Sequence, residues 1–365
     1  MQPVKTAVVG CGKISDIYFE NMINRFDILD VVACCALHLE NAQRKAQQYG
    51  IEAKTYAEIL ADPSIEMIVN LTPARAHYDI LRRGLEAGKH VYTEKIMTLE
   101  LEEARELCQL ADRQGVYLGS SPDTFLGAAY QTAKKAVADG LIGDVTSFTI
   151  TANRNSSVLA SFFTDTNKPG GGMGMNYSVY YLTGLFSILG PAVSVAGITM
   201  NPRPVRQNIL PESPQFGQTI VFETETQMFG YLELASGIAG TLHLSGESIL
   251  QDTGGITLYG SQGILCLPCP NFFGGEVKLL KPGVDYRSKC VEEILPLLFE
   301  FEDDTRGIGP ADMALAIREG RPNRASKELA FHVEEVIDAL SRSNGDGCKK
   351  KVFSTFEIPA AMKQK

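Results

Sequence analysis

The sequence predicts a two-domain α/β protein, in which a doubly wound parallel sheet is followed by an α+β domain with a large open, mainly antiparallel sheet. Three observations lead to this expectation. The chain of 365 residues exceeds one ordinary domain and suits two. Strand and helix patterns alternate over the first 120 residues, and longer β-rich stretches follow. We therefore expect a first domain over residues 1–121 and a second over residues 122–365.

The first domain consists of short apolar segments that alternate with segments of helical periodicity. Gly50, Gly88 and Gly115 follow three of the expected helices, where a glycine commonly ends a helix. Repeated strand–helix units with short links predict a parallel sheet with helices on both faces, and ligands bind such sheets beyond the carboxyl ends of the strands. The expected strands cover residues 5–9, 30–36, 66–71, 90–93 and 116–119, and the expected helices cover residues 14–25, 40–49, 76–87 and 99–114.

Beyond residue 120 the pattern changes to longer β segments, several of which alternate polar and apolar residues. Such alternation is typical of an antiparallel sheet with one buried face. An extended apolar outer face is uncommon on a monomer, so we expect this sheet to form a homo-oligomeric interface. The expected strands cover residues 145–151, 193–199, 217–223, 227–233, 238–245 and 255–259, and the expected helices cover residues 126–138, 309–319 and 327–342.

The composition argues against several classes of partner. The net charge is −9, and an acidic surface repels the phosphates of nucleic acids and anionic lipid headgroups. The sequence contains no apolar run of about 18 residues and no secretory signal, so we expect a cytoplasmic protein that binds neither nucleic acid nor membrane. The eight cysteines are typical of reduced structural thiols. No metal is expected, because Cys266 and Cys269 lack a second ligand pair and His38, His243 and His332 show no ligand spacing.

The strongest local motif is Gly10-Cys11-Gly12-Lys13-Ile14-Ser15, which follows an expected strand and opens a helix. The dinucleotide fingerprint of a Rossmann domain requires this context. The first glycine permits the tight turn, and the second lets the backbone approach a pyrophosphate at the helix N-terminus. We expect the dinucleotide to contact Gly10, Gly12, Lys13 and Ile14, with its ribose near Leu37 and His38.

The end of the second expected strand lacks the acidic residue that usually binds the ribose hydroxyls. Residues 35–38 are Cys-Ala-Leu-His, and Asp30 lies at the other end of that strand. No arginine stands there to bind a 2′-phosphate. This pattern favours NAD and leaves NADP open.

Further motifs are spread along nearly the whole chain: Leu71-Thr72-Pro73, His77, residues 85–91, Glu94-Lys95, residues 169–172 with Asn176 and Tyr180, and residues 306–309. Together they resemble the Gfo/Idh/MocA oxidoreductase family. The resemblance implies a Rossmann domain followed by a larger α/β domain whose open sheet often forms oligomer contacts. It also implies hydride transfer between a nicotinamide and a hydroxyl of a sugar, cyclitol or related polyol.

The resemblance implies roles for individual residues. The family's Glu-Lys-Pro motif places a lysine beside the nicotinamide and substrate, which matches Lys95, although Ile96 replaces the proline. The family's Asp-x-x-x-His motif matches Asn176 and Tyr180, so both polar positions differ. Asparagine can orient a hydroxyl, tyrosine can pass a proton, and residues four apart on a helix face the same side. The remaining residues expected on the cofactor side are Thr72, Pro73, His77 and Glu94.

Four further polar residues are candidate substrate contacts: Asp123, Asn153, Arg154 and Lys168. Asp123 follows the last strand of the first domain, where it either accepts a substrate hydroxyl or caps a helix that begins nearby. The candidates suit hydroxyl groups, so we expect a neutral sugar or glycoside that is oxidised at a secondary ring hydroxyl. By analogy with related sugar dehydrogenases we favour C3, with Lys95 and Tyr180 managing the hydroxyl proton.

Two other functions are compatible with these motifs. A glycoside-cleaving enzyme uses the same hydride step transiently, because oxidation of one sugar carbon acidifies its neighbour and permits elimination. Retained NAD without net redox turnover would indicate that function. The departures at residues 36, 96, 176 and 180 also allow a non-catalytic nucleotide or sugar sensor, which would bind the cofactor and turn over no polyol.

Overall fold

The computed structural model describes residues 1–162, 167–283 and 290–364. The chain forms two compact units, each of which is discontinuous in sequence. The first consists of Met1–Leu126 and Asp304–Phe331, and the second consists of Gly127–Asp303 and His332–Lys365. The sequence predicted a single domain boundary after residue 121. In the structure, residues Asp304–Phe331 return to the first unit.

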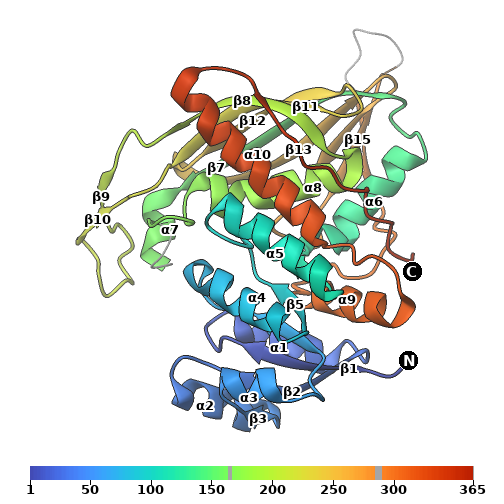
Figure 1. Ribbon diagram of the computed structural model, residues 1–365. Helices are drawn as coiled ribbons and strands as arrows, with labels where there is room; N and C mark the ends of the chain where they lie inside the picture. Colours follow the sequence, from blue (N-terminus) through green and yellow to red (C-terminus); the bar gives the residue numbers. More distant parts are fainter. Residues whose placement is uncertain (163–166, 284–289, 365) are drawn as a thin grey trace. The chain divides into compact units, whose positions relative to one another are not determined.

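The first unit contains a six-stranded sheet of order β3-β2-β1-β4-β5-β6 in which every neighbouring pair is parallel. This is the doubly wound order of dinucleotide-binding domains, and it confirms the predicted fold class. The strands are β1 (Val4–Val9), β2 (Leu29–Cys35), β3 (Glu52–Ala53), β4 (Met67–Asn70), β5 (His90–Thr93) and β6 (Leu118–Ser120). The helices between them are α1 (Ser15–Asn24), α2 (Leu39–Tyr49), α3 (Tyr56–Ala61), α4 (His77–Glu86) and α5 (Leu101–Gln114) (Figure 1).

The core of this sheet explains why its strands are nearly continuous apolar runs. All four residues of β4 are buried, as expected of a strand covered on both faces. One cluster joins Ala7, Ala33 and Ile68 to Ile59 of α3, and another joins Val91 to side chains of α4 and α5. Helix α3 was not predicted, although Thr55 and Glu58 form its capping box, a signal that is visible in the sequence.

The segment that returns to the first unit carries α9 (Ile308–Glu319). The amide of Asn21 in α1 donates to the carbonyl oxygens of Asp304 and Arg306, both at 2.9 Å. The Arg318 guanidinium pairs with the Glu66 carboxylate at 2.7 and 2.8 Å, just before β4. These contacts fix residues 304–309 beside the parallel sheet.

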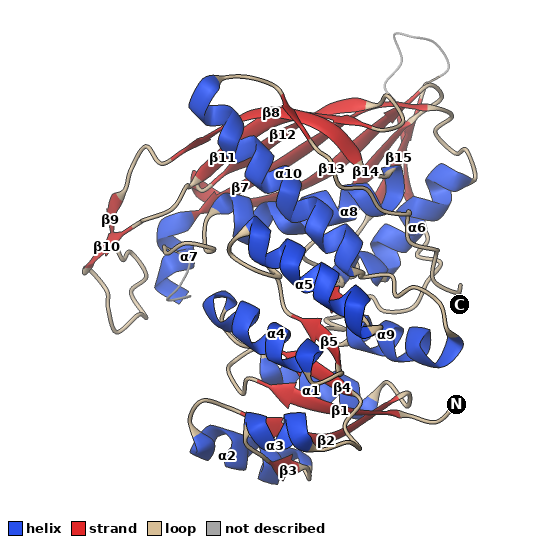
Figure 2. Cartoon of the chain, in the orientation of Figure 1, coloured by secondary structure: helices blue, strands red, loops and turns tan. Residues whose placement is uncertain are grey.

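The second unit contains a nine-stranded sheet of order β16-β15-β14-β13-β7-β12-β11-β8-β17. Its pairs are antiparallel except for β12 with β7, which confirms the predicted large, mainly antiparallel sheet. Figure 2 shows α6, α8 and α10 on one face of this sheet. The strands are β7 (Val145–Asn155), β8 (Ala192–Met200), β11 (Gln227–Leu234), β12 (Ala239–Ser245), β13 (Glu247–Gly260), β14 (Ile264–Leu267), β15 (Val277–Lys281), β16 (Val291–Leu295) and β17 (Lys350–Lys351), and the helices are α6 (Ala128–Ala138), α7 (Ser156–Phe162), α8 (Val179–Leu189) and α10 (Lys327–Asp346).

One expected strand lies outside the large sheet. Of residues 217–223, only β10 (Thr219–Val221) is a strand, and it pairs with β9 (Val205–Gln207) in a separate two-stranded sheet. Its alternating pattern specifies a strand but not the partner, because pairing is decided by contacts distant in sequence. Within the described residues, no helix combines the length and apolar character needed to cross a bilayer.

Candidate active site

The loop after β1 has the geometry of a dinucleotide-binding turn. Gly10 has a φ of 108°, and a Cβ there would lie 2.7 Å from the carbonyl carbon of Leu71, so only glycine fits. A Cβ at Gly12 would meet no atom within 4 Å, which leaves its backbone open to a ligand. Buried Ser15 donates from Oγ to the Gly12 carbonyl at 2.7 Å and starts α1. The loop therefore fits a pyrophosphate at the N-terminus of α1.

The ribose end of this site lies where β2 ends. Leu37 is 95% exposed, and the side chain of His38 is also exposed. Lys13 and Ile14 are exposed on the neighbouring loop. The residues expected to contact the dinucleotide thus surround the carboxyl ends of β1 and β2, with no acidic residue at positions 36–38.

His77 joins two loops of the cofactor side. Its ring is fully buried, with Nδ1 at 2.6 Å from the carbonyl oxygen of Ile96 and Nε2 at 2.8 Å from that of Thr72. Burial lowers the pKa of His77, and the two carbonyl contacts act in the opposite direction. Thr72 also donates from Oγ1 to the Asn70 amide oxygen at 2.8 Å, and Pro73 is exposed beside it. The structure therefore brings Thr72, His77 and the residues after β5 together.

Glu94 and Lys95 directly follow β5 in the first unit. The Tyr18 hydroxyl donates to one carboxylate oxygen of Glu94 at 2.6 Å, and the backbone N–H of Lys95 donates to the other at 3.0 Å. Burial lowers the pKa of the Lys95 ammonium, the Arg306 charge lowers it further, and Glu94 opposes both. The peptide bond between Lys95 and Ile96 is cis. A lysine of lowered pKa gives up its proton more readily than an ordinary lysine, which suits it to accept and return a proton.

Asp123 is 1% exposed and lies in the interior of the first unit. Its carboxylate accepts the backbone N–H groups of Gly309 at 3.0 Å and Gly307 at 3.3 Å. These bonds cap α9, whereas the sequence suggested either a cap on a helix beginning nearby or a substrate contact. Burial raises the pKa of Asp123 to about 6, because the surroundings disfavour the charged carboxylate.

Arg306 is a candidate functional residue for which no role was predicted from the sequence. Its side chain is 15% exposed and pairs with Asp304 at 2.5 Å. Its charge acts on both Lys95 and Asp123. The only signal was its place in the motif at residues 306–309, because the contacts that bring it to Lys95 span more than 200 residues.

The second unit holds the other expected catalytic residues. Residues Met173–Ser178 form a π-helical segment that continues into α8, so Asn176 and Tyr180 lie on either side of the junction. Both side chains are half-buried. The Asn176 amide lies 3.5 Å from the carbonyl oxygen of Gly171, whose own N–H donates to the Lys168 carbonyl at 2.8 Å. Lys168 itself has an exposed side chain.

Asn153 and Arg154 lie near the end of β7 and are half-buried. The Arg154 guanidinium stacks over Tyr177, 5.0 Å from the ring centroid. Its buried Nε has no hydrogen-bond partner within the described part of the chain. The structure thus groups Arg154 with the segment that carries Asn176.

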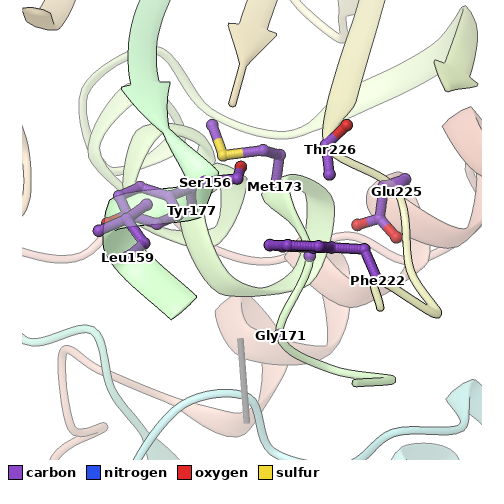
Figure 3. A pocket seen from close by; sticks show the side chains of 9 residues that line it. Ser156, Leu159, Gly171, Met173, Tyr177, Phe222, Glu225 and Thr226 are labelled. Atoms are coloured by element: carbon purple, nitrogen blue, oxygen red, sulfur yellow. The ribbon is translucent and has the colours of Figure 1, made fainter. Parts of the chain in front are cut away.

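A small pocket of about 10 Å³, room for about one water molecule, lies within the second unit beside this segment. Figure 3 shows Tyr177 on one side and Phe222, Glu225 and Thr226 on the other. The Glu225 carboxylate accepts the Gly174 N–H at 2.8 Å, and a Cβ at Gly172 would lie 2.3 Å from it. The glycine-rich segment predicted from the sequence therefore makes room for a carboxylate at the start of the π-helical turn. Across the described ranges, no group of three or more His, Cys, Asp or Glu side chains is placed to hold a metal ion.

Comparison with known proteins identifies both parts of the chain. Residues 4–121 match the model of an oxidoreductase family with an NAD-binding Rossmann fold. Residues 130–266 match the model of the GFO/IDH/MocA C-terminal domain. Together the two models span the dinucleotide loop, Lys95, Asn176 and Tyr180.

Relatives with and without an assigned activity are similar over half to nearly all of their length. D-glucoside 3-dehydrogenase of Escherichia coli K12 is 25% identical over 361 residues, which cover 95% of this chain and 97% of that protein. The NAD⁺-dependent scyllo-inositol 2-dehydrogenase of Bacillus subtilis 168 is 26% identical over 67% of this chain and 68% of that protein. An uncharacterized oxidoreductase of Schizosaccharomyces pombe is 30% identical, and the match spans about half of each protein, 53% of this chain and 54% of the relative.

Solved structures share the fold. Levoglucosan dehydrogenase in complex with NADH superposes with a TM-score of 0.82 at 17% identity, covering 97% of this chain and all of that one. Aldose-aldose oxidoreductase of Caulobacter crescentus superposes with a TM-score of 0.79 at 18% identity, over 96% of this chain and 100% of that one.

Proposed function

Because the chain belongs to the Gfo/Idh/MocA family of NAD-binding oxidoreductases, we propose that it oxidises a secondary ring hydroxyl, at C3, of a neutral sugar or glycoside. The proposal rests mainly on the position and chemistry of Lys95. This lysine has a lowered pKa and follows a parallel strand in the same unit as the dinucleotide loop. A strand end of this kind is where such sheets bind ligands.

The residues have separate tasks in this proposal. Gly10, Gly12 and the start of α1 would hold NAD, which would supply the hydride acceptor for this oxidation. Lys95 and Tyr180 take the hydroxyl proton as the carbon becomes a ketone. Asn176 hydrogen-bonds a neighbouring hydroxyl and fixes which carbon reacts.

The substrate class rests on chemistry and on similarity. The substrate candidates include three uncharged side chains that suit hydroxyl groups: Asn153, Asn176 and Tyr180. The net charge of −9 does not attract anionic substrates at long range. The choice of C3 is supported by the 25% identity with the D-glucoside 3-dehydrogenase, which extends over nearly the whole chain.

We also propose that the outer face of the nine-stranded sheet joins copies of this chain. Ile198 and Met200 of β8 are 42% and 41% exposed, and Phe229 of β11 pairs in register with Ile198. An exposed apolar row on the face of a sheet is typical of a protein interface.

The test is a panel of glucosides, free sugars and inositols, incubated with the protein and NAD or NADP while nicotinamide absorbance is followed. We expect NAD reduction with a glucoside and a 3-keto product in mass spectrometry and NMR. Activity confined to phosphorylated or carboxylated substrates would contradict the proposal. Release of the aglycone without net NADH would instead indicate glycoside cleavage.

A further inference from the structure

We propose that Tyr18 is a positioning residue that acts on Lys95 through Glu94. Ser121 and Tyr92 stand behind Tyr18 and complete a chain of three buried hydroxyl groups. The inference rests on the proposed role of Lys95 in proton transfer. Tyr18 lies on α1, Tyr92 lies in β5, and Ser121 follows β6, all within the first compact unit. The chain therefore joins the helix after the dinucleotide loop to the strand end that carries Lys95.

The three hydroxyl groups lead in single file to the Glu94 carboxylate. Tyr18 donates to one carboxylate oxygen at 2.6 Å. The Tyr18 oxygen lies 3.2 Å from the Ser121 hydroxyl, which lies 3.3 Å from the Tyr92 hydroxyl. Both tyrosines are fully buried and Ser121 is 4% exposed, so the chain is shielded from bulk water.

The carboxylate at its end fixes the direction of every bond in the chain. An ionised carboxylate only accepts hydrogen bonds, so the single proton of the Tyr18 hydroxyl points to Glu94. Ser121 must then donate to Tyr18, and Tyr92 must donate to Ser121. Burial raises the pKa of Tyr18 and of Tyr92, so both keep their protons. Bonds that point the same way polarise one another, which strengthens the contact with Glu94.

Glu94 transmits this contact to Lys95 by position and by charge. Its second carboxylate oxygen accepts the backbone N–H of Lys95 at 3.0 Å, so both oxygens are fixed. Burial lowers the pKa of Lys95, whereas the negative charge of Glu94 raises it. Without the Tyr18 hydroxyl, the half-buried carboxylate is free to turn toward water, which screens its attraction for the ammonium. Loss of that hydroxyl should therefore lower the pKa of Lys95 further.

Other ionisable groups of the first unit interact with Glu94 or Lys95: His77, Tyr92, Asp123 and Arg306. Burial lowers the pKa of His77 and raises that of Tyr92, so both are neutral above pH 7. Burial raises the pKa of Asp123 to about 6, so this carboxylate is ionised there. These groups keep their charges when only the Tyr18 hydroxyl is removed, so a shift can be assigned to the hydroxyl chain.

The experiment follows kcat/KM against pH for NAD reduction by the full chain with a glucoside that it oxidises. Oxidation needs the neutral amine, so the profile rises through the pKa of Lys95. In Tyr18→Phe we expect this rising limb to move to lower pH by about half a unit or more. Ser121→Ala keeps the bond from Tyr18 to Glu94 but removes the donor behind it, so it should move the limb the same way by less.

Tyr56→Phe is the matched control, because the Tyr56 hydroxyl also donates at 2.6 Å in the same unit, but to the carbonyl oxygen of Ile80. It removes one hydrogen bond and should leave the limb in place. Glu94→Gln removes the charge itself and should lower the limb by about one to two units. Adding Tyr18→Phe to Glu94→Gln should cause no further shift, because Tyr18 acts through that charge.

An unchanged limb in Tyr18→Phe, or a further shift in the double variant, would overturn the proposal and leave the oxidation intact. If Tyr18→Phe does not fold, Ser121→Ala decides: a limb at lower pH supports the chain, and an unmoved limb rejects it.

If no glucoside is oxidised, the proposed function fails, and the chain is tested without turnover. The rate at which acetic anhydride acetylates Lys95, read by mass spectrometry across pH, reports the pKa of its amine. A lower pKa in Tyr18→Phe than in the unmodified protein and in Tyr56→Phe supports the proposal. Equal values in the three proteins overturn it.

Discussion

Lys95 and Tyr180 are expected to act as one proton-transfer unit. Lys95→Ala should lower turnover by about 10²–10⁴-fold, the usual effect of losing a positioned acid or base. Tyr180→Phe removes one hydroxyl and should lower kcat more than it raises KM. If the two residues act together, the double variant should be little worse than the poorer single variant. Additive losses in steady-state kinetics would show that they act independently, and near-native turnover of Lys95→Ala would exclude its catalytic role.

Arg306 is expected to set the pH at which Lys95 works. Oxidation needs the neutral amine, so activity should rise with pH through the Lys95 pKa. Burial and the Arg306 charge both lower that pKa. Removing the charge in Arg306→Gln should raise the pKa and move the rising limb of the kcat/KM profile to higher pH. Burial persists in the variant, so the shift should be partial.

The control for this prediction is Arg82→Gln, which removes a half-exposed guanidinium from α4 in the same unit. It should leave the profile in place. An unchanged profile in Arg306→Gln would show that burial alone sets the pKa of Lys95.

Asp123 should make the cap of α9 sensitive to pH. Burial raises its pKa to about 6 in the folded protein, against an ordinary value of 3.8. The folded state therefore holds the proton more tightly than the unfolded state between these values. This contribution to stability is fully present below pH 4 and is lost as pH rises to about 6, at a cost of up to roughly 3 kcal/mol.

Asp123→Asn keeps an oxygen acceptor for the Gly307 and Gly309 N–H groups and carries no charge. We therefore expect the variant to be more stable relative to the unmodified protein at pH 8 than at pH 4. Its free energy of unfolding minus that of the unmodified protein should be larger at pH 8. Urea unfolding at both pH values measures the difference. A constant difference between the two proteins would show that the Asp123 pKa is not raised on folding.

The elements also show what local sequence can and cannot predict. Strands β1, β2, β4 and β5 were predictable because a covered parallel strand is a continuous apolar run. The π-helical turn at Asn176 was not, because the contacts that surround it, such as Glu225 beside Gly172 and Gly174, are distant in sequence. The expectation that Asn176 and Tyr180 face the same side assumed a regular α-helix, but the side-chain period changes at the junction between them.

Only some residues of the candidate site could be predicted from the sequence. Gly10, Gly12 and Lys95 were found because each belongs to a short motif at a strand end. Arg306 and the α9 cap were not assigned roles. Residues 304–309 contact the first segment of the first unit, but the sequence of the second unit separates the two segments. Contacts of such separation leave no periodic pattern in the sequence.

The outer face of the nine-stranded sheet should hold copies of this chain together. Gly197 and Gly230 face α10, since a Cβ on either would lie 2.7 Å from Leu340. Side chains alternate along a strand, so the neighbouring Ile198 and Phe229 point away from α10. Phe229 also packs on His243 of β12, with ring centroids 4.7 Å apart. The result is a row of apolar and aromatic groups across β8, β11 and β12 that lacks a helix above it in Figure 2.

Replacing Ile198 and Phe229 by Glu places two charges in this row, where desolvation opposes association. We expect light scattering at micromolar concentration to give an oligomeric mass for the unmodified protein and a monomeric mass for the double variant. Val205→Glu is the control, because Val205 is 63% exposed on β9, outside the large sheet; it should leave the mass unchanged. A monomeric mass for the unmodified protein would contradict the interface. An oligomer that survives both charges would place the contact on another face, because an apolar row cannot bury unpaired carboxylates without losing its affinity.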